Sequence, residues 1–148
     1  MPLKLNQNCE IILLDDDDDD FFFLKEAFRA YSDQITLHHL TDHTTLLASL
    51  QSAKTLPSLI LLDMHLGGED GLSILTQLKQ NKHLRDVPVV VWSGSIADQQ
   101  VNQCYQAGAS SVVIKSDNQP DLERVIQQLC DYWFSAVQLP FYAKQSDC

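Results

Sequence analysis

The chain has 148 residues, enough to bury the core of a single domain, and its formal net charge is −10. Binding a nucleic-acid backbone needs clustered Lys and Arg, which this acidic chain lacks, so we expect no nucleic acid among its partners. No apolar run approaches the roughly 18 residues of a membrane span, and no basic-then-apolar leader opens the sequence, so we expect no membrane partner. The four cysteines lie far apart, which is typical of reduced thiols in a cytoplasmic protein.

Six consecutive aspartates, residues 15–20, directly follow the first predicted strand at residues 11–14. A run of like charges is usually a solvated or disordered tract. Here an apolar segment resumes directly after the run and leaves no room for a long disordered tract. We therefore expect Asp15 and Asp16 to end the strand and one of the last three aspartates to start a helix. This helix is predicted to run to about Tyr31, with the acids favoured at its positive amino end.

Four more strand-and-helix units follow along the chain, and in the third helix Lys79 and Lys82 are predicted to lie in solvent. His38 and His39 are weak candidates for metal ligands, because adjacent strand residues point to opposite faces. Continuous apolar strands that alternate with helices indicate a parallel sheet covered on both sides. We therefore expect a doubly wound α/β domain with a five-stranded parallel sheet. The later strands are predicted at residues 35–40, 58–62, 89–92 and 111–114, and the later helices at residues 42–53, from 71, 97–107 and 120–134.

Asp63 ends the apolar run of the third predicted strand and is followed by a segment with paired glycines. A lone aspartate at such a place most often starts a turn or caps a helix. In this chain, however, Asp15 and Asp16 follow the first strand, Ser93 ends the fourth and Lys115 follows the fifth. Because the functional site of an open α/β sheet lies outside the carboxyl ends of its strands, we expect these five side chains to meet at one edge.

Carboxylates crowded together in a partly buried site repel one another unless a hard cation lies between them. We therefore expect a divalent ion, and Mg²⁺ suits a set of oxygen ligands made of aspartates, a backbone carbonyl near His65 and a phosphoryl oxygen. Lys115 adds a fixed positive charge and Ser93 a hydroxyl donor. These groups stabilise a phosphoryl group that passes onto an oxygen nucleophile, and we predict that Asp63 is this nucleophile.

The pattern is carried by Ile11-Ile12-Leu13-Leu14-Asp15-Asp16, by Leu59-Ile60-Leu61-Leu62-Asp63-Met64-His65-Leu66-Gly67-Gly68-Glu69-Asp70-Gly71, by Val87-Pro88-Val89-Val90-Val91-Trp92-Ser93, and by Ala107-Gly108-Ala109 and Ile114-Lys115. Over nearly the whole chain these segments resemble the receiver domain of two-component response regulators. The resemblance implies a sheet in the order 2-1-3-4-5 and a phosphoryl group taken from a sensor histidine kinase. Such a domain promotes its own phosphorylation and dephosphorylation and is not otherwise an enzyme. The residues implied are Asp63 as phosphoacceptor, Ser93 and Lys115 as phosphoryl-binding groups, and Asp15, Asp16, Asp63 and the carbonyl of His65 as Mg²⁺ ligands.

No output domain follows this pattern, so we expect a stand-alone regulator that signals through its fourth helix, fifth strand and last helix. The segment 133–140 further resembles single-domain regulators paired with phytochrome-type photoreceptor kinases. The aromatic residues at 132–134 and 141–142 form more apolar surface than a helix of this size hides. They either pack back on the domain, form a homodimer contact or dock the kinase. The domain is predicted at residues 9–136, with a lead-in at residues 1–8 and a tail at residues 137–148.

Three positions depart from the pattern of this family. Ser116 follows Lys115 where receivers usually have a proline after a cis bond, so either the loop contains a costly cis bond or Lys115 is aimed differently. Val112 stands where an aromatic switch residue is usual, and Gly67 where proline is frequent. His65, two residues past the nucleophile, is predicted to alter the rate at which the phosphoryl group is lost.

Two other functions stay open on the sequence alone. A phosphatase of the haloacid dehalogenase type also uses Asp-x-Asp after its first strand, here Asp15 and Asp17, with a later Ser and Lys. It would need another acidic strand end after the lysine and usually a cap domain, and neither is evident. A receiver-like adaptor that is never phosphorylated is favoured by Ser116, Val112 and Gly67.

Overall fold

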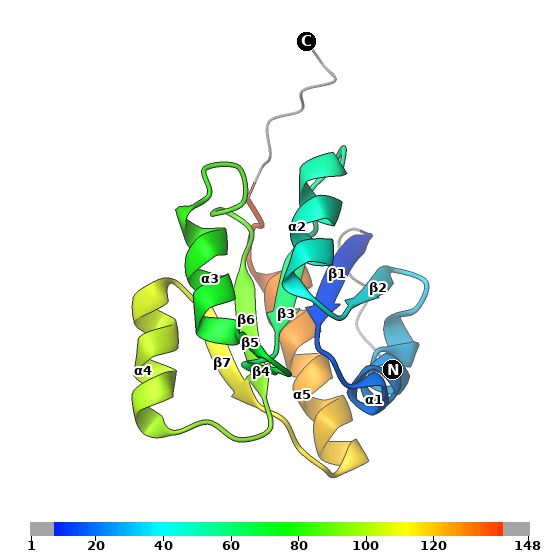
Figure 1. Ribbon diagram of the computed structural model, residues 1–148. Coiled ribbons are helices and arrows are strands. Elements are labelled where there is room, and N and C mark those ends of the chain that lie inside the picture. The colour runs from blue at the N-terminus through cyan, green and yellow to red at the C-terminus, as the bar shows by residue number, and fades with distance from the viewer. Residues whose placement is uncertain (1–7, 141–148) are drawn as a thin grey trace.

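Five parallel strands form the central sheet of the protein, whose residues 8–140 are described by a computed structural model (Figure 1). The strands are β1 (Cys9–Leu14), β2 (Ile35–Leu40), β3 (Leu59–Leu62), β6 (Val89–Ser93) and β7 (Ser111–Ile114). Their order in the sheet is β2-β1-β3-β6-β7, and every neighbouring pair is parallel. Since β6 and β7 are the fourth and fifth strands of this sheet along the chain, the predicted order 2-1-3-4-5 is confirmed.

Within the described residues, five α-helices cover the sheet, namely α1 (Asp18–Ala27), α2 (His43–Ser52), α3 (Gly71–Gln80), α4 (Asp98–Ala107) and α5 (Gln119–Asp131). Helices α1 and α5 lie on one face, and α2, α3 and α4 on the other (Figure 1). Successive residues of a strand point to opposite faces, so Leu13 packs in the apolar cluster with Leu24 and Ile126, whereas Leu14 packs in the cluster with Leu75. The doubly wound α/β prediction is therefore confirmed.

Side-chain caps begin four of these five helices, and the first cap bears on the aspartate run. The Asp17 carboxylate accepts a hydrogen bond from the Asp19 amide at 2.8 Å, so α1 begins directly after Asp17. Asp42, Asp70 and Asn118 cap α2, α3 and α5 in the same way. Because α1 starts so soon after β1, its first turn stays beside the carboxyl edge of the sheet.

A short antiparallel hairpin, which the sequence pattern did not predict, lies between β3 and α3. Its strands are β4 (His65–Leu66) and β5 (Glu69–Asp70), and Gly67 at its tip has a φ of 58°, a conformation that favours glycine. The Gly71 amide donates to the Met64 carbonyl oxygen at 3.2 Å, and a Cβ on Gly71 would lie 2.6 Å from the Met64 Cα. The hairpin therefore fixes the backbone that follows β3.

The expectation that Lys79 lies in solvent is wrong. Its side chain turns back over the connection from α3 to β6, where its Nζ donates to the carbonyl oxygens of Arg85 at 3.0 Å and Val87 at 2.8 Å. Its stem also fills the space beside Gly108, where an added Cβ would lie 2.9 Å from the Lys79 Cγ. Burial lowers the pKa of Lys79 from its ordinary value. This lysine therefore joins three segments of backbone at the amino end of β6.

Helix ends differ from the prediction in detail. Helix α1 ends before the predicted end near Tyr31, and a separate 3₁₀ turn, η1 (Arg29–Tyr31), follows it. The last helix continues past Asp131, as predicted, but as a π-helical turn, η2 (Tyr132–Ala136), which was not predicted. No helix within residues 8–140 is both long enough and apolar enough to cross a membrane. Residues 1–7 and 141–148 lie outside the described residues, so most of the predicted lead-in and tail, with the aromatic pair at 141–142, stays a prediction.

Candidate functional site

The side chain of Lys115, directly after β7, lies among three carboxylates at the carboxyl edge of the sheet. Its Nζ lies 2.7 Å from Asp20 Oδ2, 2.9 Å from Asp15 Oδ2 and 3.2 Å from Asp63 Oδ2. Asp15 follows β1, Asp63 follows β3, and Asp20 lies in the first turn of α1. Parallel strands bring their carboxyl ends to one edge, so residues far apart in sequence share one ammonium group.

Two acids of this cluster, Asp15 and Asp63, are shielded from solvent, and the charges of all three acids are coupled to Lys115. Asp15 is fully buried and Asp63 is 6% exposed. Burial raises the pKa of Asp15 to about 7, although a hydrogen bond from the Asp17 amide and the contact with Lys115 both lower it. For Lys115, burial alone would lower the pKa, but its hydrogen bonds to Asp20 and Asp15 outweigh burial and raise it. Lys115 is therefore a fixed positive charge at this edge.

The donor set of the site fits a divalent cation. Asp15, Asp20 and Asp63 each offer a carboxylate oxygen, and these oxygens all lie within 4.8 Å of one another. A site made only of oxygen donors suits hard ions such as Mg²⁺ or Mn²⁺. Asp16 is exposed and stands outside this group, with its Oδ2 3.1 Å from the point where a Cβ on Gly67 would lie. The structure thus brings Asp15 and Asp63 together with Asp20, and places Asp16 at the tip of the hairpin.

Ser93 and His65 both point their polar groups at the loop after β6. The buried Ser93 hydroxyl donates to the carbonyl oxygen of Ser95 at 3.2 Å, and His65 Nε2 lies 3.0 Å from that same oxygen. A carbonyl oxygen only accepts, so Nε2 carries the proton and donates. The His65 amide also donates to Asp63 Oδ1 at 3.0 Å. His65 therefore links the Asp63 segment to the Ser95 loop, and Ser93 is held on Ser95 in this structure.

Two residues of this edge were missed by the sequence prediction, Asp20 and His39. His39 Nε2 lies 2.7 Å from the carbonyl oxygen of Asp15, and its ring stacks on Phe21 with centroids 4.5 Å apart. Asp20 falls one helical turn after the Asp17 cap, a spacing that becomes readable only once the structure shows which aspartate is the cap. His39 is paired with Leu13 near the end of β2. The Lys115–Ser116 bond is trans, since residues 8–140 contain no cis peptide bond, and Lys115 still faces the acids.

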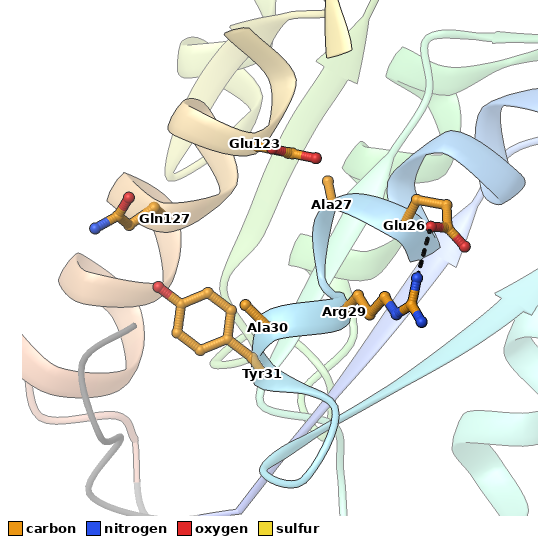
Figure 2. Close-up of a pocket in the computed structure, with 7 residues that line it drawn as sticks. All are labelled: Glu26, Ala27, Arg29, Ala30, Tyr31, Glu123 and Gln127. Carbon is orange, nitrogen blue, oxygen red and sulfur yellow. Dashed lines mark ion pairs between the residues drawn. The ribbon is translucent and has the colours of Figure 1, made fainter. Parts of the chain in front are cut away.

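A hollow of about 530 Å³ lies elsewhere, between α5 and the segment formed by α1 and η1 (Figure 2). Arg29 and Glu26 form an exposed ion pair there at 3.7 Å, with Glu123 across the hollow on α5. Tyr31 lines the same space, and burial raises its pKa to about 12. Its buried hydroxyl has no hydrogen-bond partner in the described part of the chain. The hollow is lined by none of the four residues of the charged cluster, Asp15, Asp20, Asp63 and Lys115. The hollow and the charged cluster are therefore separate places on the protein.

Known proteins share this sequence pattern. Response regulator Rcp1 of a Synechocystis species is 37% identical over 84 residues, which are 57% of this chain and 57% of the relative. The probable methanogenesis regulatory protein FilR2 of Methanothrix harundinacea is 35% identical over 80 residues, 54% of this chain and 52% of the relative. The matched stretch thus spans little more than half the length of these relatives.

Solved structures share the fold over most of the chain. The phosphorylated cyanobacterial phytochrome response regulator RcpA superposes with a TM-score of 0.83 at 27% identity. The Mn²⁺-bound form of response regulator Rcp1 superposes with a TM-score of 0.80 at 30% identity. Each alignment covers 90% of this chain and 99% of the other. The sequence model of the response regulator receiver domain matches residues 11–127, well over half of the chain, and the chain therefore belongs to this family.

Proposed function

We propose that this protein is the phosphoryl acceptor of a two-component system, with Asp63 as the acceptor and a sensor histidine kinase as the donor. The observation that carries the proposal is the contact of Asp63 Oδ2 with the Lys115 ammonium at a shared, shielded edge. An Asp63 oxygen attacks phosphorus, the new O–P bond forms as the P–N bond of a phosphohistidine breaks, and the imidazole takes up a proton. Lys115 and the Ser93 hydroxyl then bind the phosphoryl oxygens.

The proposed cation is Mg²⁺, held through Asp15, Asp16, Asp63 and the backbone carbonyl of His65. When bound, it would offset the charge of the carboxylates and of the incoming phosphoryl group. Asp15 and Asp63 already lie in one oxygen cluster, whereas Asp16 lies outside it, beside Gly67 at the hairpin tip. The chain's own contribution is to hold these carboxylates in place before the reaction, through β1, β3 and the hairpin after Asp63.

The proposed switch begins at Ser93, whose hydroxyl must leave the Ser95 carbonyl to reach a phosphoryl group on Asp63. Movement of this loop would reach α4 and β7. The position that usually carries an aromatic is Val112, and its amide donates to the hydroxyl of Tyr105 on α4 at 3.3 Å. Tyr105 and Ile114 are exposed on this face, which we propose as the surface that reports phosphorylation.

The proposed donor is a kinase of the phytochrome type, because RcpA and Rcp1 resemble this chain and RcpA is a phytochrome response regulator. We place the exchange in the cytoplasm. A homodimer through the last helix and the C-terminal aromatics is also proposed, since Tyr132 is exposed at the start of η2. The domain itself is proposed to span residues 9–136.

The decisive experiment treats the full chain with Mg²⁺ and acetyl phosphate and measures its mass. We expect one labile phosphoryl adduct, located on Asp63 and absent from the Asp63→Asn variant. Asp33→Asn, which removes an exposed acid outside the cluster, is the matched control and should behave as the parent. An unmodified parent chain would support the adaptor function instead, and steady release of phosphate from a generic ester would support a phosphatase.

A further inference from the structure

We propose that Asp20 is a positioning residue that keeps the Lys115 ammonium aimed at Asp63 throughout the phosphoryl cycle. This inference deepens the proposed function and rests on it, because it gives Lys115 a task at the phosphoryl group. It assigns Asp20 no contact with the phosphoryl group itself. The three acids that surround Lys115 differ in their contacts and in their proposed roles.

The Lys115 ammonium has three N–H donors, and the three carboxylates occupy all of them. The contact with Asp20, at 2.7 Å, is the shortest, and that with Asp63, at 3.2 Å, is the longest. Charge-assisted bonds of this length are among the stronger hydrogen bonds in proteins. In the resting arrangement, therefore, Asp20 holds Lys115 at least as firmly as the acids buried behind it.

Asp15 and Asp63 have a second task in the proposed reaction, whereas Asp20, although its carboxylate oxygen lies in the same cluster, is not among the proposed Mg²⁺ ligands. Asp63 would take the phosphoryl group and Asp15 would hold the cation, so each would share its carboxylate between Lys115 and a second partner when the site is in use. Asp20 lies at the rim with 34% of its side chain exposed, on a helix turn that the Asp17 cap fixes. Its bond to Lys115 is the one that can persist while the others are exchanged.

Lys115 needs such an anchor because its backbone contacts do not fix the direction of its side chain. Its amide is held by the carbonyl oxygen of Ser93 at 2.8 Å, but the next residue is Ser116, which has no ring to restrict the chain. The Ser116 hydroxyl oxygen accepts a hydrogen bond from the Asn118 amide at 3.1 Å. A lysine stem has many rotamers, so a fixed carboxylate at its end decides where the ammonium lies.

The remaining aspartates of the run do not share this role. Asp17 caps α1, and Asp18 is almost fully exposed, with only a loose 4.0 Å approach to His39. Asp19 is exposed and makes no contact with Lys115. Asp19 and Asp20 carry the same charge in the same helical turn, so a change at either alters the charge near the helix start equally. Asp19 is therefore a matched control for Asp20.

The first test compares the rates at which Asp20→Ala and Asp19→Ala take a phosphoryl group from acetyl phosphate in saturating Mg²⁺. The loss of one charge-assisted bond predicts a rate about tenfold lower for Asp20→Ala at the same Mg²⁺ midpoint, with Asp20→Asn in between and Asp19→Ala unchanged. In a Lys115→Met background, Asp20→Ala should cause no further loss, because Asp20 acts only through Lys115. Equal rates for Asp20→Ala and Asp19→Ala, or an equal loss in the Lys115→Met background, would overturn the inference.

The second test needs no phosphoryl chemistry and separates this inference from the proposed function. Nitrogen-15 NMR of the lysine ammonium groups should show a Lys115 signal protected from water exchange, assigned by its absence in Lys115→Met and distinct from that of Lys79, whose ammonium donates to two backbone carbonyls. Protection should be lost in Asp20→Ala and kept in Asp19→Ala. Unchanged protection in a folded Asp20→Ala chain would refute the role of Asp20, whereas a parent chain with a protected signal but no adduct would refute only the function of Asp63.

Discussion

Two lysines, one at each edge of the sheet, show what distinguishes a reactive site from a structural joint. Lys115 lies at the carboxyl edge among Asp15, Asp20 and Asp63, and Lys79 lies at the amino edge against two backbone carbonyls. Both ammonium groups are largely withdrawn from water, which by itself lowers a lysine pKa. The pKa of Lys79 is lowered, whereas that of Lys115 is raised because its acceptors carry full charges.

The difference teaches that withdrawal of a lysine from solvent is not enough to mark function. The carbonyl partners of Lys79 are fixed in the backbone and cannot take another ligand without unfolding the connection to β6. The carboxylate partners of Lys115 can exchange the ammonium for a cation or a phosphoryl group. A lysine among exchangeable acids is therefore a candidate for chemistry, and one among fixed carbonyls holds the fold together.

The largest effect is expected from Lys115→Met. Three carboxylates would stay together without a positive partner, and loss of one member of a buried ion network destabilises a protein by about 3 kcal/mol. We expect a free energy of unfolding lower by that amount in urea at pH 7.5 with EDTA. Added Mg²⁺ should restore part of it, because the cation replaces the lost charge. If Lys115→Met is as stable as the parent in EDTA, Lys115 does not offset the charge of the three carboxylates, and the contrast with Lys79 fails.

Lys79→Met should cost about 2 kcal/mol, because two carbonyl oxygens lose a charged donor while the apolar stem is kept. The same urea experiment measures this change. Acceptance of a phosphoryl group from acetyl phosphate should stay at the parental rate, and Mg²⁺ should not restore stability. A slower phosphorylation in this variant would mean that the two edges are coupled, contrary to the comparison.

The pH dependence of stability should differ between the edges, because Asp15 titrates in the acid range. In the folded metal-free protein its pKa is raised from 3.8 to about 7, so the folded chain holds this proton more tightly than the unfolded chain. The stability from Asp15 is fully present below about pH 4 and is lost as pH rises towards 7. Asp15→Asn should flatten this dependence in urea titrations at pH 4.5 and 7.5. An unchanged slope would show that another group carries it.

The smallest effect is expected from His65→Asn. The shorter side chain no longer reaches the Ser95 carbonyl, so the loop with Ser93 moves more freely towards a phosphoryl group on Asp63. This hydrogen bond is exposed, and we expect phosphoryl loss to slow only about twofold to threefold. The decay of the adduct mass over time measures it, and the interpretation fails if the rate stays the same.

The sheet could be predicted because its strands are continuous apolar runs and their polar ends align by topology, which placed Asp15, Asp63 and Lys115. The role of Asp20 could not, since six identical residues contain no periodicity that tells which one faces inward. Lys79 was missed because a long flexible side chain can return to a buried carbonyl from a surface position. The two-residue strands β4 and β5 are too short to give an alternating pattern.

The hairpin after Asp63 also limits where this chain can change. A side chain at Gly71 would collide with the backbone of Met64, and one at Gly67 would have to adopt a φ of 58°, so both positions disfavour substitution. Gly68, between them, has no neighbour within 4 Å for an added Cβ and has no positive φ. A cysteine introduced at Gly68 gives an attachment point for a fluorescent dye a few residues from Asp63, at a position of the loop that has room for a side chain.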